Sequence, residues 1–232
     1  MSDNIYEAYG DKEKYTKYTK QAWTRAGGFP VNKEEVYPEH KIAQEFDNYH
    51  GQLVLEYGCG GGSDAISYLK RGNSVVLVDI VPHNIEIAKK NVGSLASAAD
   101  FHLLEDSHIL PFEDGQFDVV NSHGVLHHVV DVLPVVEQLY RVTVSGGYGY
   151  FMLYTEFLFE KAQSSMKTWM EEKGISWQEA FCWFTDSINS PYAIPYNEKE
   201  GIALFESVGY KIVDCYVYNN LDFRRFKVQK VK

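Results

Sequence analysis

The sequence has few cysteines, and they lie far apart. Only three, Cys59, Cys182 and Cys215, occur in 232 residues. An odd number at wide spacing argues against a disulfide framework and against a zinc knuckle. Such sparse use of cysteine suits a reducing compartment, and we therefore expect a cytoplasmic protein.

Long apolar runs and a basic surface are also lacking. No run approaches the ~18 apolar residues of a membrane-spanning helix, and the polar N-terminus is unlike a secretory signal. The 22 basic residues are outnumbered by 32 acidic ones, for a formal net charge of −10. A long nucleic-acid footprint needs a basic stripe, so we do not expect a nucleic-acid partner. Because no apolar run is long enough, we do not expect a membrane span either. The sequence does not indicate an oligomeric state.

The middle of the chain alternates short apolar runs with helical patterns, which is typical of βαβ units and a parallel sheet. Strands are predicted at 52–57, 74–79, 101–105, 117–121 and 148–153, and helices at 63–71, 82–92 and 131–142. After an aromatic-rich interval, a helix is predicted at 198–208 and strands at 211–218 and 223–231. The short spacing of these last two strands favours an antiparallel hairpin.

A glycine-rich turn follows the first predicted strand, in the stretch Glu56-Tyr-Gly-Cys-Gly-Gly-Gly62. Glycines at such a turn let the backbone approach a ligand closely and direct N–H groups towards it. Asp79 follows about 20 residues later, at the end of the second strand, where a carboxylate can accept hydrogen bonds from ribose hydroxyls. Dinucleotide sites and other nucleoside sites share this pattern.

Three details favour a nucleoside other than a dinucleotide. The dinucleotide fingerprint needs glycine or alanine at position 63, where Ser63 stands. Glu56 would repel a pyrophosphate but can pair with the ammonium group of an amino acid. Polar residues at 105–107, after the third strand, can recognise an adenine amine. S-adenosylmethionine, which has an amino-acid end, a ribose and an adenine, satisfies all three.

The motifs resemble those of a known family. The stretch 54–62 resembles the first motif of class I S-adenosylmethionine-dependent methyltransferases. The stretches 110–120, 124–128 and 140–147 resemble the small-molecule branch that includes the ubiquinone/menaquinone-type enzymes. The resemblance extends over residues 50–153. It implies an α/β, Rossmann-like, doubly wound seven-stranded sheet, mostly parallel, with the last strand antiparallel next to the fifth.

The resemblance also implies the cofactor, S-adenosyl-L-methionine, and a set of residues that bind it. These are Glu56, Gly58 and Gly60 at the methionine end, Asp79 and Ile80 at the ribose, Asp106 and Ser107 at the adenine, and His123 at the cofactor's edge. For Asp106, a helix N-cap is the structural alternative.

Two segments, residues 1–50 and 155–196, lie outside the alternation of strands and helices. They are candidate walls of a substrate pocket, because ligands of open parallel sheets bind beyond the carboxyl ends of the strands. In the N-terminal segment, Tyr15 and Arg25 are further candidate cofactor contacts, and the glycines around residues 10–30 favour a mobile lid. The predicted organisation is an N-terminal helical lid at 1–50, a cofactor-binding core at 51–154, a helical substrate lid at 155–196, and a completing helix and hairpin at 197–232.

His123, His127 and His128, with Asp131, form the densest titratable cluster in the sequence. His127 or His123 is a candidate general base, because imidazole titrates near neutral pH; packing beneath the site is the alternative. No E-x-x-H or C-x-x-C partner accompanies them, so no metal site is expected.

The sequence therefore predicts an enzyme that transfers a methyl group from S-adenosylmethionine to an oxygen or nitrogen of a small molecule. An NAD-dependent oxidoreductase is supported only by the glycine turn and Asp79. A non-catalytic S-adenosylmethionine-binding scaffold is a further alternative, because fold alone does not determine function.

Overall fold

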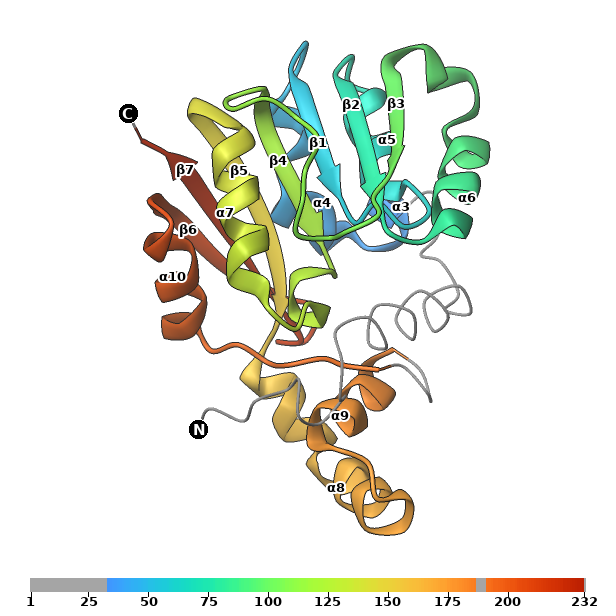
Figure 1. Cartoon of the computed structure of the whole chain (residues 1–232), viewed down its shortest axis with the longest axis vertical. Helices are drawn as coiled ribbons and strands as arrows, with labels where there is room; N and C mark the ends of the chain where they lie inside the picture. Colours follow the sequence, from blue (N-terminus) through green and yellow to red (C-terminus); the bar gives the residue numbers. More distant parts are fainter. Residues whose placement is uncertain (1–32, 187–190, 232) are drawn as a thin grey trace.

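The computed structural model describes residues 33–186 and 191–231, and within them seven strands form one sheet (Figure 1). The strand order is β3-β2-β1-β4-β5-β7-β6. The strands are β1 (Leu53–Tyr57), β2 (Ser74–Asp79), β3 (Ala99–Leu103), β4 (Phe117–His123), β5 (Thr143–Tyr154), β6 (Tyr210–Tyr218) and β7 (Phe223–Lys230). Strands β1 to β5 run parallel to one another, and β7 lies between β5 and β6 and is antiparallel to both. The predicted fold is confirmed.

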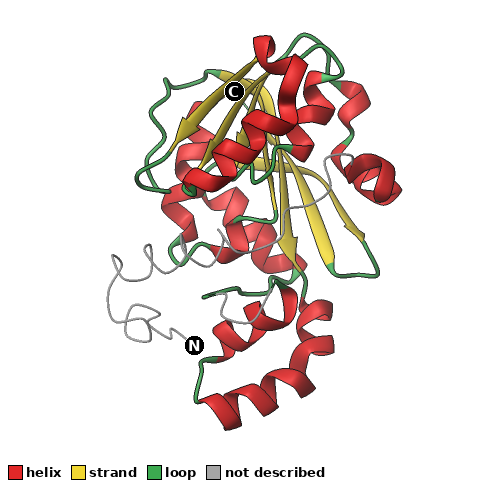
Figure 2. Ribbon diagram, turned by 90° about the vertical axis from the view of Figure 1, so that its right-hand side faces the viewer, coloured by secondary structure: helices red, strands yellow, loops and turns green. Residues whose placement is uncertain are grey.

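Helices cover both faces of this sheet (Figure 2). They are α3 (Lys33–Val36), α4 (Pro38–Gln44), α5 (Ser63–Leu69), α6 (Pro82–Val92), α7 (Val132–Val142), α8 (Glu156–Lys173), α9 (Trp177–Thr185) and α10 (Glu198–Ser207). Short 3-10 helices are η1 (Phe46–Asn48), η2 (Gly93–Ala98) and η3 (Leu126–His128). Among the described residues, none of these helices combines the length and the apolar character needed to cross a membrane.

The strand pattern explains the layers. Successive side chains of a strand point to opposite faces, so Val54 packs with α5 and α6, whereas Leu55 packs with α7 and α10. Apolar residues occupy both positions because the parallel strands are covered on both faces. This continuous apolar pattern is what made the central strands recognisable in the sequence.

Strand β3 lies two residues earlier than predicted. It pairs with β2 from Ala99 to Leu103, and the partner strand ends at Asp79, opposite Leu103. Leu104 then donates one further backbone hydrogen bond to Asp79, at 2.9 Å. The strand follows the length of its neighbour rather than the apolar run, because β3 is an edge strand whose side chains are only half-buried.

The insertion between β5 and α10 is helical, as predicted. Helices α8 and α9 follow β5 in the chain and lie beyond its carboxyl end, outside the sheet (Figure 1). They share a separate apolar cluster that includes Phe181 of α9 together with Met152 and Tyr154 of β5. The N-terminal residues 10–30, with Tyr15 and Arg25, lie outside the described residues.

Candidate cofactor and active site

The glycine turn after β1 has the backbone conformation that only glycine adopts easily. Gly58, Gly60 and Gly62 have φ of +74°, +51° and +79°. A Cβ on Gly58 would lie 2.3 Å from Cγ2 of Val125, in the loop after β4, whereas a Cβ on Gly60 would meet nothing within 4 Å. Gly58 therefore permits close packing of two loops, and Gly60 presents an open face of the turn.

Asp79, at the end of β2, is tied to that turn. Its Oδ2 accepts hydrogen bonds from the Gly60 N–H at 2.9 Å and from the Asn84 amide at 3.1 Å, and its Oδ1 accepts from the Val81 N–H at 2.8 Å. Burial raises the pKa of Asp79, and these donors oppose the rise. The donors hold the carboxylate in one orientation. Asn84 was not predicted, since a polar residue on a helix carries no signal of this contact.

The loop after β3 is connected to β1. The Tyr57 hydroxyl donates to the Ser107 carbonyl at 2.7 Å. Asp106 Oδ1 accepts from the backbone N–H of His108 at 2.8 Å and lies 2.9 Å from its ring Nδ1. Residues 104–116 contain no helix, so Asp106 stabilises a turn rather than a helix N-terminus.

Glu56, the penultimate residue of β1, is a buried carboxyl group whose hydrogen bond comes from a neutral amide. It is 3% exposed, and its Oε2 accepts from the Asn121 amide at 2.8 Å. Burial and the nearby negative charge of Asp64 raise the pKa of Glu56 well above its ordinary value. A cation placed here would therefore be strongly favoured.

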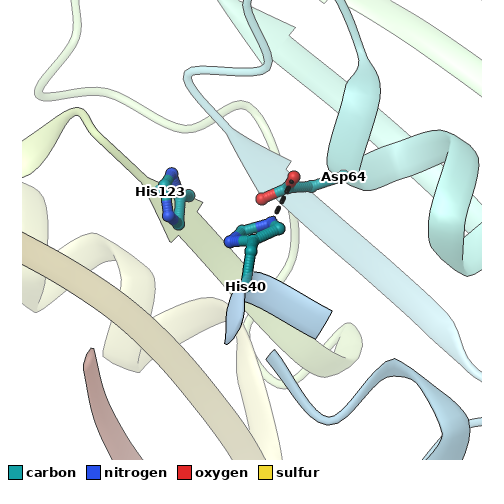
Figure 3. A group of neighbouring side chains, drawn as sticks. All are labelled: His40, Asp64 and His123. Atoms are coloured by element: carbon teal, nitrogen blue, oxygen red, sulfur yellow. Dashed lines mark hydrogen bonds and ion pairs between the residues drawn. The ribbon is translucent and has the colours of Figure 1, made fainter. Parts of the chain in front are cut away.

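Asp64, in contrast, is surrounded by cationic and hydrogen-bonding partners from the N-terminal helices (Figure 3). His40 Nε2 lies 2.8 Å and Lys33 Nζ lies 3.2 Å from Asp64 Oδ1. Burial opposes the ionisation of Asp64, but His40 and Lys33 outweigh it and hold its pKa well below the ordinary range. The sequence did not point to His40 or Lys33, because both precede the first motif and meet it only in the fold.

The comparisons with known proteins agree with this geometry. Residues 55–151 match the family described as "Methyltransferase domain". The ubiquinone biosynthesis O-methyltransferase of Idiomarina loihiensis is 24% identical over 164 residues, which are 69% of this chain and 64% of that protein. The chain thus spans less than two thirds of the length of this curated relative.

Two solved structures have the same fold. One is the putative methyltransferase bound to the Trm112 activator of Haloferax volcanii, with a TM-score of 0.67 at 15% identity, covering 92% of this chain and 96% of that one. The other is an S-adenosylmethionine-dependent methyltransferase from Methanosarcina mazei, with a TM-score of 0.65 at 18% identity, covering 82% and 97%. The match over residues 55–151 and the shared fold together support a class I S-adenosylmethionine-dependent methyltransferase.

The residues of this methyltransferase fit the family's cofactor, S-adenosylmethionine. Glu56 offers a carboxyl group for an ammonium ion, and the open face at Gly60 leaves room beside the turn. Asp79 uses three hydrogen bonds of the roughly four that a carboxylate can accept. Asn121 Oδ1 and Ser122 Oγ, both buried at the end of β4, have no hydrogen-bond partner within the described part of the chain. Buried polar atoms of this kind indicate a ligand.

The two candidate catalytic histidines of the methyltransferase differ in their surroundings. His123 Nδ1 lies 2.9 Å from Lys33 Nζ, and its Nε2 lies 2.8 Å from the Tyr218 hydroxyl. Neither ring nitrogen of His127 has a hydrogen-bond partner in the described residues, although the ring is fully buried and lies 3.7 Å from the Tyr154 ring, centroid to centroid. Burial lowers the pKa of both histidines well below the ordinary value. Within the described residues, side-chain hydrogen bonds therefore hold the His123 ring, whereas the His127 ring is held by contacts with the rings of Tyr154 and His128.

Proposed function

We propose that this protein transfers a methyl group from S-adenosylmethionine to an oxygen or nitrogen atom of a small molecule. When bound, this cofactor supplies an electrophilic methyl group on a sulfonium. The observation that carries the proposal is the line of polar groups along one edge of the sheet. Glu56 lies near the end of β1, Asp79 ends β2, and Asn121 with Ser122 lies near the end of β4.

Each of these groups has a proposed role. Glu56 holds the ammonium group of the methionine end, with Asn121 orienting its carboxylate. Gly58 and Gly60 form the turn beside it. Asp79 and Ile80 bind the ribose, Asp106 and Ser107 lie at the adenine, and Tyr15 and Arg25 contact the methionine end.

His127 is proposed as the general base. Its neutral ring can accept the proton of an acceptor hydroxyl or ammonium group, because burial holds it in the unprotonated form at neutral pH. His123 is proposed to border the cofactor without moving a proton, since both its nitrogens are engaged by Lys33 and Tyr218. Positioning of the acceptor supplies the remaining rate, on the order of 7–11 kcal/mol for well-oriented reactants.

The insertion 155–196 is proposed to cover the acceptor. Helix α9 packs through Phe181 on Tyr154, the residue that contacts His127. Aromatic residues of α8 and α9 pack in one apolar cluster with Met152 and Tyr154 of β5. A pocket beside such a cluster favours a small organic acceptor over a charged polymer. We further propose a cytoplasmic location, which the sparse use of cysteine supports.

Calorimetric titration tests the proposal. We expect saturable binding of S-adenosylmethionine and of S-adenosylhomocysteine and none of NAD. Binding of NAD instead would support the oxidoreductase alternative. Binding of S-adenosylmethionine without methyl transfer to any member of a hydroxyl- and amine-bearing acceptor library would support the scaffold alternative. Failure of both cofactors to bind would overturn the proposal.

A further inference from the structure

Two clusters of metal-ligating side chains lie in the described part of the chain. One is His40, Asp64 and His123, and the other is His128, Cys182 and Asp186; in each, one ligand atom per residue lies within 4.8 Å of the others. Their charges and contacts decide which of them can hold an ion.

The first cluster already contains a cation. Lys33 Nζ lies 3.2 Å from Asp64 Oδ1 and 2.9 Å from His123 Nδ1. Figure 3 shows the three members of the cluster, His40, Asp64 and His123. Two neutral histidines, one carboxylate and one ammonium sum to no net charge. A divalent ion added here would leave two uncompensated positive charges in a buried site, which is strongly unfavourable. This cluster is an ion-pair network.

The second cluster has the complementary charge. It connects η3 in the core to α9 in the insertion, through His128 at one end and Cys182 and Asp186 at the other. A thiolate and a carboxylate carry two negative charges, and a neutral imidazole adds none. One divalent ion would therefore make the site neutral. Within the described residues, the ion-pair partner of Asp186 is His128.

The orientation of His128 matches that of a metal ligand. Its Nδ1 lies 2.8 Å from the Tyr192 carbonyl oxygen, so Nδ1 carries the proton and donates it. The lone pair is then on Nε2, which lies 3.6 Å from Asp186 Oδ2. A separation of 3.6 Å is too long for a hydrogen bond, and when Nε2 is unprotonated a cation between the two atoms would attract both. Metal-binding histidines characteristically donate their other ring N–H to a backbone carbonyl in this way.

The cysteine lies close to both other members of the cluster. Cys182 Sγ lies 3.7 Å from Asp186 Oδ2 and 3.8 Å from the Nδ1 atom of His128. Zinc bonds of about 2.0–2.3 Å at a tetrahedral centre place neighbouring ligand atoms roughly 3.3–3.6 Å apart. Asp186 is itself held, since its Oδ1 accepts from the Tyr154 hydroxyl at 3.1 Å and its Oδ2 from the Thr185 hydroxyl at 2.6 Å. The three ligand atoms, which lie within 4.8 Å of one another, must therefore draw together when they bind an ion.

We propose that His128 Nε2, Cys182 Sγ and Asp186 Oδ2 bind a zinc ion that fastens the insertion to the core. The mixed nitrogen, sulfur and oxygen donors select a borderline-soft ion such as Zn²⁺ over Mg²⁺ or Ca²⁺. On binding, Cys182 releases its thiol proton to solvent. The site lies next to the proposed base, because the His128 and His127 ring centroids are 4.3 Å apart.

Cobalt titration of the full chain tests this site directly. Co²⁺ added to the metal-free protein should give one equivalent of a thiolate-to-metal charge-transfer band in the near ultraviolet, which Zn²⁺ then displaces. Cys182→Ser should abolish the band and weaken Zn²⁺ binding by more than about 100-fold, since even outer-shell changes cost 10–100-fold. Cys215→Ser, the matched control on β6, should retain both.

Thermal unfolding gives an independent measurement. Zn²⁺ should raise the Tm of the wild-type protein and of His40→Gln, whose residue belongs to the first cluster, but not that of Asp186→Asn. Circular dichroism establishes that each variant is folded, and if Cys182→Ser is not, Cys182→Ala takes its place in the cobalt titration. Absence of the band in folded wild-type protein, or its persistence in the folded ligand variant, would overturn the proposal.

Discussion

At the scale of single residues, the surroundings of three buried carboxyl groups determine what each can bind. Burial raises the pKa of Glu56 and Asp79, whereas His40 and Lys33 hold the pKa of Asp64 low. Asp64 is therefore already neutralised by the protein itself. Glu56 gains most from an incoming cation, which is why it is assigned to the ammonium group.

Replacing Glu56 with glutamine should stabilise the free protein and weaken cofactor binding. Because the folded pKa of Glu56 lies above its ordinary value, ionising it costs stability as pH rises past 4.5. Glu56→Gln removes that cost, so its Tm at pH 7 should exceed the wild-type Tm. The affinity for S-adenosylhomocysteine should fall at least tenfold. A lower Tm with unchanged affinity would contradict the assignment.

Asp79→Ala should weaken cofactor binding by about 10- to 100-fold. The change removes an acceptor of charged hydrogen bonds, each contributing roughly 1.5–3 kcal/mol. Asp100→Ala is the matched control, since Asp100 is an exposed carboxylate on the neighbouring strand. Isothermal titration with S-adenosylhomocysteine measures both. Equal affinities in the two variants would exclude the ribose role.

His127→Gln should lower kcat by roughly 10²–10⁴ while cofactor affinity stays close to the wild-type value. Since burial holds the pKa of His127 well below 6.5, the wild-type rate should not change between pH 7 and 8 and should fall only in acid. Steady-state kinetics from pH 8 down into the acid range provides the check. If the rate of the variant falls in acid just as the wild-type rate does, His127 only packs the site.

At the scale of elements, the contact between the glycine turn and the loop after β4 sets the shape of the cofactor-binding edge. Gly58→Ala should lower both Tm and cofactor affinity, because its Cβ would collide with Val125. Gly72→Ala is the control: it has a similar φ of +79° but nothing within 4 Å, so it reports backbone strain alone, roughly 1–3 kcal/mol. Adding Val125→Ala should partly restore Gly58→Ala; equal losses in the two single variants would rule out the collision.

At the scale of the whole molecule, buried neutral histidines join the N-terminal helices, the core and the insertion. Burial lowers the pKa of His40, His123 and His127 below 6.5. The unfolded chain then binds more protons than the folded one below that pH, so stability is lost as pH falls through 6.5, at up to about 1.4 kcal/mol per pH unit for each histidine.

The raised pKa of Glu56 acts in the opposite direction, since protonation of Glu56 adds stability as pH falls. In the Glu56→Gln background, which removes that opposing contribution, Tm should decline between pH 7 and 5.5, before the carboxylates with lowered pKa values are protonated. His127→Gln should reduce by one the number of protons taken up on unfolding, so its Tm should depend less steeply on pH. Differential scanning calorimetry across the range measures both slopes. A Tm that does not change down to pH 5 would mean that these histidines are charged in the folded protein.

The sequence by itself determined the fold and the cofactor, and it located the glycine turn and the carboxylate that ends β2. Parallel strands covered on both faces need continuous apolar runs, and a turn that approaches a ligand needs glycine. Both features depend on residues that are adjacent in the sequence, at 53–62 and 74–79, so the sequence predicts them. The error at β3 has the same origin, because an edge strand has a weaker apolar pattern and its length follows the strand beside it.

Only the tertiary structure decided which charges meet. Lys33 and Asp64, or His128 and Asp186, are distant in the chain and have no local pattern, since an ion pair depends on distance in space. The same holds for His123 and His127, which the sequence could not rank. Their proposed roles differ because folding places Lys33 and Tyr218 against the His123 ring, and the rings of Tyr154 and His128 against the His127 ring.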